Sequence, residues 1–188
     1  MATSTTLPTM VINYRSPTMI QYTDRGRLVA EFTNTMKLSE HFDLSEFCRK
    51  GETPDDITVG HLRLLCVILL EPLRVAWGSG ITPTSGYRSP ERNATIKGAS
   101  KTSAHPLGYA ADIVPANGKM AEFKAFVKDW LNGRTEEGKI GAPFDQCIDE
   151  RNAAGAEWMH IGLLNGKGEM RQQFLKTTDG VHYFADKV

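Results

Sequence analysis

Two short stretches, residues 103–112 and 157–160, constrain the fold of this chain more than any other part of its sequence. The first reads Ser-Ala-His-Pro-Leu-Gly-Tyr-Ala-Ala-Asp and contains His105 and Asp112; the second reads Glu-Trp-Met-His and ends at His160. Asp112 lies in an apolar, strand-like run, where a buried carboxylate needs a partner. Two imidazoles and one carboxylate would hold a zinc ion and leave its fourth position open. An arginine or several backbone donors would be the alternative partner for Asp112.

Two glutamates compete for the role of taking a proton from water at such a site. Glu157 lies three residues before His160, whereas Glu150 ends the preceding strand-like run, 144–149. In a regular strand Glu157 and His160 would face opposite sides. Glu157 therefore fits the role only at an irregular strand entry, which Gly155 would permit.

Four segments in this order resemble the zinc D-alanyl-D-alanine peptidases, a group that also includes phage cell-wall endopeptidases and the hedgehog signalling domain. The resemblance covers about residues 37–175, and its motifs are 84–93, 103–112, 144–148 and 157–160. We therefore expect a hedgehog-like or D-Ala-D-Ala peptidase-like α+β domain. A small antiparallel sheet of about four or five strands should carry a zinc ion (Zn2+) on one face and pack helices on the other.

The resemblance also implies roles for individual residues. The expected zinc ligands are His105, Asp112 and His160. Glu157 is preferred over Glu150 as the proton acceptor, because the family commonly has an acidic residue three positions before its last histidine. Arg88 would stabilise the negative charge that develops on the substrate, with Arg92 as a competitor. The expected substrate contacts are Ser103, Tyr87 and Trp158, although core packing explains Trp158 equally well.

The chain divides into an N-terminal extension, 1–36, and a zinc peptidase domain, 37–188. Two strand-like runs around a turn at residues 24–26 predict a β-hairpin in the extension. Helical spacing predicts helices at 58–77 and 117–132, the first kinked or split at Pro72. Asp179-Gly180 predicts a terminal hairpin.

Composition narrows the class of protein further. The chain has 188 residues, a net charge of zero and three cysteines. Zero net charge favours neither nucleic acid nor an anionic membrane as a partner, and an odd cysteine count argues against a disulfide framework. Residues 1–10 do not resemble a signal peptide, and no apolar run suits membrane insertion. We expect synthesis in the cytoplasm.

The resemblance implies a zinc metallopeptidase that hydrolyses an amide bond in peptidoglycan stem peptides or cross-links. The bond would be D-alanine-containing or an L-alanine–D-glutamate junction, so carboxypeptidase and endopeptidase activities both stay open. A phage or prophage lysin released by a holin-like pore fits this activity, as does a virion-associated enzyme attached through residues 1–36. The alternative is a non-catalytic binding or virion structural protein that keeps the zinc fold.

Overall fold

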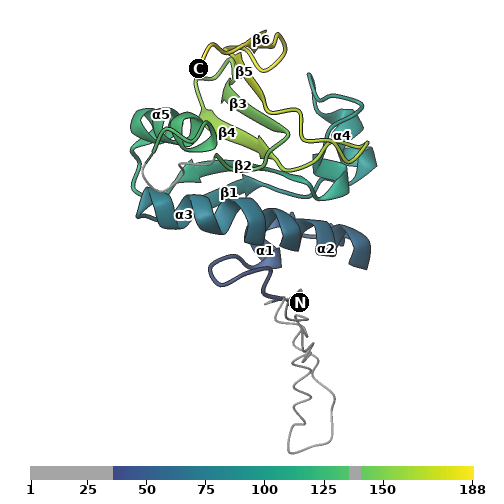
Figure 1. Ribbon diagram of the computed structural model, residues 1–188. Helices are drawn as coiled ribbons and strands as arrows, with labels where there is room; N and C mark the ends of the chain where they lie inside the picture. The colour runs from purple at the N-terminus through teal and green to yellow at the C-terminus, as the bar shows by residue number, and fades with distance from the viewer. Residues whose placement is uncertain (1–35, 136–140) are drawn as a thin grey trace, which may run out of the picture. The chain divides into compact units, whose positions relative to one another are not determined.

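The computed structural model describes residues 36–135 and 141–188 of the chain (Figure 1). The hairpin predicted for residues 1–36 falls almost wholly outside these residues. No helix in the described ranges is long and apolar enough to cross a membrane.

A six-stranded sheet forms the centre of the domain, with the strand order β1-β2-β4-β3-β5-β6. Its strands are β1 (Ile81–Ser85), β2 (Ala110–Pro115), β3 (Gln146–Arg151), β4 (Glu157–Gly162), β5 (Gln173–Thr177) and β6 (Phe184–Ala185). The β3–β5 pair is parallel and the others are antiparallel. The α+β class is as predicted. The expectation of a purely antiparallel sheet of four or five strands is wrong, because the chain returns beside β3 in the same direction.

A long helical segment runs below the sheet in Figure 1, made of α2 (Asp56–Leu65), the π-helical turn η1 (Cys66–Leu70) and α3 (Glu71–Trp77). The Asp55 side chain caps its start by accepting a hydrogen bond from the Thr58 amide at 2.8 Å. Pro72 has no backbone N–H to donate. The π-helical turn just before it changes the hydrogen-bond pattern of the helix at this point. The helix predicted to be kinked or split at Pro72 is not split, but its hydrogen-bond pattern changes directly before Pro72.

The remaining helices are short, apart from α5, which covers the sheet next to β2 and β4. They are α1 (Leu44–Phe47), α4 (Pro90–Thr95), the 3-10 helix η2 (His105–Leu107) and α5 (Met120–Leu131). The α4 helix follows the loop that carries Arg88. Its Ser89 side chain accepts a hydrogen bond from the Arg92 amide, and Pro90 occupies its first position.

The two faces of the sheet differ in chemistry. Strands β2 and β4 send fully buried apolar side chains to the face that α5 and the long helix cover: Ala111, Ile113, Met159 and Ile161. The intervening residues of the same strands, Asp112 and His160, are buried on the other face. The polar face of the sheet is therefore the place to look for a functional site.

The C-terminus forms the expected hairpin. Strand β6 returns antiparallel to β5, pairing Ala185 with Leu175 and Phe184 with Lys176. The loop between them, residues 178–183, begins next to the end of β3, because Thr177 pairs with Glu150.

Candidate functional site

Three side chains meet at the centre of the polar face. His105 Nε2 lies 3.1 Å from His160 Nδ1 and 3.2 Å from Asp112 Oδ1, and the last two atoms are 3.0 Å apart. All three residues are buried. Two stretches separated by more than 40 residues thus place three ligand atoms at the corners of a nearly equilateral triangle.

Strand pairing and a tight turn bring these residues together. Asp112 and His160 are direct partners in the β2–β4 register. His105 opens the 3-10 helix η2, which ends at Gly108 with a left-handed backbone, φ 74°. A Cβ on Gly108 would lie 2.6 Å from the Thr58 carbonyl oxygen, so only glycine lets this turn pack against α2.

A backbone carbonyl fixes the orientation of the His105 ring. The ring Nδ1 lies 2.6 Å from the Gly86 carbonyl oxygen, which can only accept a hydrogen bond. Nδ1 therefore carries the proton, and Nε2 keeps a lone pair directed at the other two ligand atoms. Gly86 approaches this closely because it lacks a side chain: a Cβ there would lie 2.6 Å from Phe47.

The second carboxylate oxygen of Asp112 is held by Arg88. The Arg88 Nη2 donates to Asp112 Oδ2, and the Arg88 Nε donates to Ser85 Oγ at 3.0 Å. A register shift between Pro83 and Ser85 brings Ser85 opposite Asp112. This β-bulge aims the start of the Arg88 loop at the site. Sequence reasoning missed Ser85 and the Gly86 carbonyl, although both lie in the 84–93 motif.

The protonation states suit a metal. Burial lowers the pKa of His105, against the opposing pull of Asp112, so its imidazole stays neutral. Burial alone would raise the pKa of Asp112, but the nearby His105 and His160 rings hold it well below its usual range. Neutral imidazoles and an ionised carboxylate are the forms in which these residues bind metals.

The distances fit a tetrahedral zinc ion. Ligand atoms at roughly 2.0–2.1 Å from a tetrahedral ion lie about 3.3 Å from one another. The three observed separations, 3.0–3.2 Å, are slightly shorter than this. An outward movement of a few tenths of an ångström would therefore admit the ion, with His105, Asp112 and His160 as its protein ligands.

Glu150 lies on the same face as this group. It pairs with Trp158 in the β3–β4 register, and its neighbour Ile148 pairs with His160. Its side chain is buried. Burial and the negative charge of Asp112 raise the pKa of Glu150 to about 7, although the charges of His160 and Arg88 oppose this. A carboxyl group that titrates near neutrality can both accept and release a proton.

Glu157 lies on the opposite face, contrary to the preference drawn from the family pattern. Strand β4 is regular from Glu157 onward, and Glu157 pairs with Arg151. Its carboxylate lies 3.3 Å from Lys124 Nζ on α5 and 3.5 Å from Arg151 Nε. The irregular strand entry that Glu157 needed does not occur, and the geometry instead places Glu150 beside the His–Asp–His group.

The other expected site residues have mixed locations. Trp158 lies across from Glu150, and its indole N–H is buried without a hydrogen-bond partner among the described residues. Ser103 is half-buried, and its hydroxyl accepts a long hydrogen bond, 3.4 Å, from the His105 amide. Both positions are compatible with substrate contact.

The recorded contacts of Tyr87 and Arg92 are with residues outside the metal group. Tyr87 packs against the hydrophobic core, and burial together with Glu52 and Glu91 raises its pKa. Arg92 forms an ion pair with Glu52 at 2.7 Å. On the loop after β1, Arg88 thus contacts Asp112, while its neighbour Tyr87 packs against the hydrophobic core. The expected substrate contact by Tyr87 stays a prediction.

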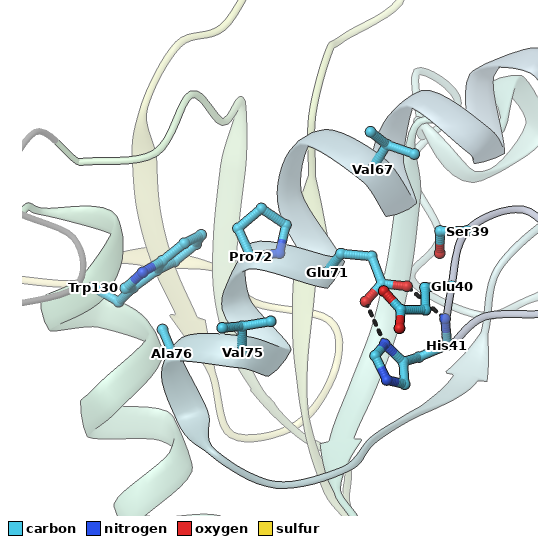
Figure 2. A pocket seen from close by; sticks show the side chains of 9 residues that line it. All are labelled: Ser39, Glu40, His41, Val67, Glu71, Pro72, Val75, Ala76 and Trp130. Carbon is cyan, nitrogen blue, oxygen red and sulfur yellow. Dashed lines mark hydrogen bonds and ion pairs between the residues drawn. The ribbon is translucent and has the colours of Figure 1, made fainter. Parts of the chain in front are cut away.

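A separate hollow of about 530 Å³ lies along the outer side of the long helix (Figure 2). Figure 2 shows Pro72 and Trp130 at one end and the His41–Glu71 pair at the other, where His41 Nδ1 lies 2.8 Å from Glu71 Oε2. None of the three ligand residues lines it. The catalytic chemistry is therefore not expected in this hollow.

Comparison with known proteins agrees with the residue pattern. The family model for peptidase M15 matches residues 40–139, which is 100 of the 188 residues. The match includes Arg88, His105 and Asp112 and ends before Glu150 and His160. No curated protein matches the chain. M15 peptidases are zinc-dependent, which agrees with the buried His–Asp–His group. The chain belongs to the peptidase M15 family.

Proposed function

We propose that this protein is a zinc peptidase that hydrolyses an amide bond in the stem peptides or cross-links of peptidoglycan. The observation that carries the proposal is the triangle of ligand atoms from His105, Asp112 and His160, with sides of 3.0–3.2 Å. Family membership supports the peptidase chemistry. The peptidoglycan substrate follows from the resemblance of the motifs to enzymes that act on D-alanine-containing peptides.

His105, Asp112 and His160 would hold the zinc ion. When bound, zinc supplies a Lewis acid that polarises a carbonyl group and allows water to ionise near neutral pH. The chain supports these ligands from behind: the Gly86 carbonyl holds the His105 ring and Arg88 holds the Asp112 carboxylate. Such outer contacts keep the ligand atoms in the geometry that the metal requires.

We assign the proton transfers to Glu150 rather than Glu157. The Glu150 carboxylate takes a proton from the attacking water, and the resulting carboxylic acid delivers it to the leaving amide nitrogen. A pKa of about 7 makes both steps accessible at neutral pH. Glu157 cannot share this task, since its carboxylate is engaged by Lys124 and Arg151 on the other face of the sheet.

Arg88 has two roles in this proposal. Its Nη2 and Nε are occupied by Asp112 and Ser85, so it positions a metal ligand. Its Nη1 has no hydrogen-bond partner among the described residues and remains available for a substrate oxygen that gains negative charge. The half-buried Ser103 hydroxyl is a further donor for the bound peptide.

Digestion of purified peptidoglycan tests the proposal. We expect the zinc-loaded protein to release peptide fragments, a chelator to stop the release, and mass spectrometry of the products to identify the bond. Glu150→Gln should remove activity while Glu157→Gln keeps it. Absence of fragment release by the correctly folded, zinc-loaded protein would favour the alternative, a non-catalytic binding protein.

For the biological setting, we propose a phage or prophage lysin that reaches the wall through a holin-like pore. Attachment to a virion through residues 1–36 is the alternative. Cells that co-express the protein with a holin should lyse, and cells with either protein alone should not. Lysis by the Glu150→Gln variant to the same extent would contradict an enzymatic role.

A further inference from the structure

The loop between β5 and β6, residues 178–183, lies at the edge of the proposed site. Strand β5 ends at Thr177, the direct partner of Glu150 in the parallel β3–β5 pair. The chain that follows must therefore leave the sheet beside the Glu150 carboxyl. The family-model match does not reach this loop, because it ends at residue 139.

This loop has a defined conformation. The Thr177 hydroxyl accepts a hydrogen bond from the Gly180 amide at 3.0 Å. The Asp179 carboxylate accepts hydrogen bonds from the Val181 and His182 amides, both at 2.9 Å, and pairs with the His182 ring at 2.6 Å. Such side-chain contacts to the backbone fix the shape of a short loop. The backbone of the loop is therefore held in place.

The loop also touches the segment that leads into the His105 motif. A Cβ on Gly98 would lie 2.4 Å from the Gly180 carbonyl oxygen, so the two backbones are in direct contact. In Figure 1 the yellow C-terminal chain passes beside α4, in agreement with this contact. The 178–183 loop and the 96–102 segment are thus in direct contact.

Tyr183 ends this loop and carries an accessible phenol. Its hydroxyl makes only a long contact, 3.5 Å, to the Gly180 carbonyl, and 39% of the residue is exposed. Burial raises the pKa of Tyr183 to about 12, with contributions from the charges of Glu150 and Asp112. Phe184 pairs with Lys176, so Tyr183 comes next in register opposite Thr177, which is itself the partner of Glu150. This register places the phenol on the Glu150 side of the sheet, and the phenol remains protonated and able to donate.

We propose that Tyr183 is a substrate-binding residue of this peptidase, and that its phenol donates a hydrogen bond to a carbonyl or carboxylate oxygen of the stem peptide. The inference rests on the proposed function. A neutral donor suits this position, since Glu150, Asp112 and Asp179 already supply negative charge around it, and a further anion would repel an acidic peptide. The rigid loop keeps the entropic cost of this contact low.

The test compares Tyr183→Phe with Tyr109→Phe. Both changes remove one phenol oxygen, but Tyr109 stacks on His61 at 4.0 Å on the side of α2. The ligand is a synthetic stem pentapeptide that contains an L-Ala–D-Glu junction and a D-Ala–D-Ala end. Its affinity is measured by calorimetry on zinc-loaded protein in the Glu150→Gln background, and KM and kcat are measured with Glu150 intact.

We expect Tyr183→Phe to weaken peptide binding about fivefold to tenfold and to raise KM similarly, as the loss of one hydrogen bond does. Zinc content and kcat of Tyr183→Phe should stay within twofold of the parent, and its thermal unfolding temperature should not change. Tyr109→Phe should leave the affinity for the peptide unchanged. Parent-like binding by Tyr183→Phe, in a protein that cleaves the peptide, would overturn this inference alone. Failure of the parent to bind or cleave would overturn the proposed function and this inference together.

Discussion

The two faces of the β2–β4 pair differ in what their side chains do, although they belong to the same strands. On one face Ile113 and Ile161 are fully buried among helix residues. On the other face their sequence neighbours, Asp112 and His160, are also buried but contact each other and His105. Buried side chains thus stabilise the fold on one face and form the candidate metal site on the other. Substitutions on the apolar face should therefore change the free energy of unfolding, and substitutions on the polar face should change zinc binding and activity.

The largest effect on the polar face is expected from His160→Ala. The change removes one of three metal ligands, so zinc content should fall from about one ion per chain toward none. Activity should fall by at least about a thousandfold, because a catalytic metal supplies several kcal/mol of transition-state stabilisation. Elemental analysis and peptidoglycan digestion measure the two quantities. As a control, His41→Ala, in the hollow of Figure 2, should keep both. Full zinc content in His160→Ala would contradict the ligand assignment.

The next effect separates the two glutamates, which lie on opposite faces of paired strands. Glu150→Gln should lower kcat by about 10²–10⁴, the usual contribution of a general base, while zinc binding persists. Glu157→Gln should change kcat less than about threefold, since it loses only partly exposed ion pairs with Lys124 and Arg151. Steady-state kinetics on the stem pentapeptide measures both. A reversal of the two results would restore Glu157 as the base.

On the apolar face, Ile161→Ala should reduce stability rather than chemistry. Ile161 is fully buried, and truncation of such a side chain typically costs about 2–5 kcal/mol in the free energy of unfolding. Denaturant titration measures this loss. Below the unfolding transition the variant should bind zinc with parent stoichiometry. Loss of zinc from the folded variant, without loss of stability, would break the proposed division between the faces.

The smallest effect concerns pH and the metal-free protein. The folded pKa of Glu150 is about 7, above the ordinary value of 4.5, so its contribution to stability is fully present below pH 4.5 and is lost as pH rises through 7. Glu150→Gln removes the charge that Glu150 would carry when buried at high pH. The gain in the free energy of unfolding that this substitution gives the metal-free protein should therefore be about 2 kcal/mol larger at pH 8 than at pH 5. Thermal unfolding of both proteins at the two pH values measures the difference. Equal differences at pH 5 and pH 8 would show that Glu150 is not buried as described.

Residue patterns are sufficient to predict the α+β class, the grouping of His105, Asp112 and His160, and the helical irregularity beside Pro72. Each depends on local chemistry: an aspartate in an apolar strand needs a partner, and proline interrupts a helical hydrogen-bond pattern. The terminal hairpin at Asp179-Gly180 was predictable for the same reason, because its turn is specified by adjacent residues.

The features that sequence reasoning misjudged depend on long-range pairing. Strand alternation alone puts Glu157 on the opposite face from His160, and the regular register of β4 follows this periodicity rather than the family pattern. The parallel β3–β5 pair and the bulge before Ser85 follow from tertiary register, which local sequence does not specify.

The most direct test of the account is a crystal structure of the zinc-loaded protein with anomalous diffraction at the zinc edge. The account predicts one strong peak at about 2.0–2.2 Å from His105 Nε2, Asp112 Oδ1 and His160 Nδ1, with Glu150 on the same side of the sheet. A peak elsewhere, or no peak at this triangle in a protein that cleaves peptidoglycan, would contradict it.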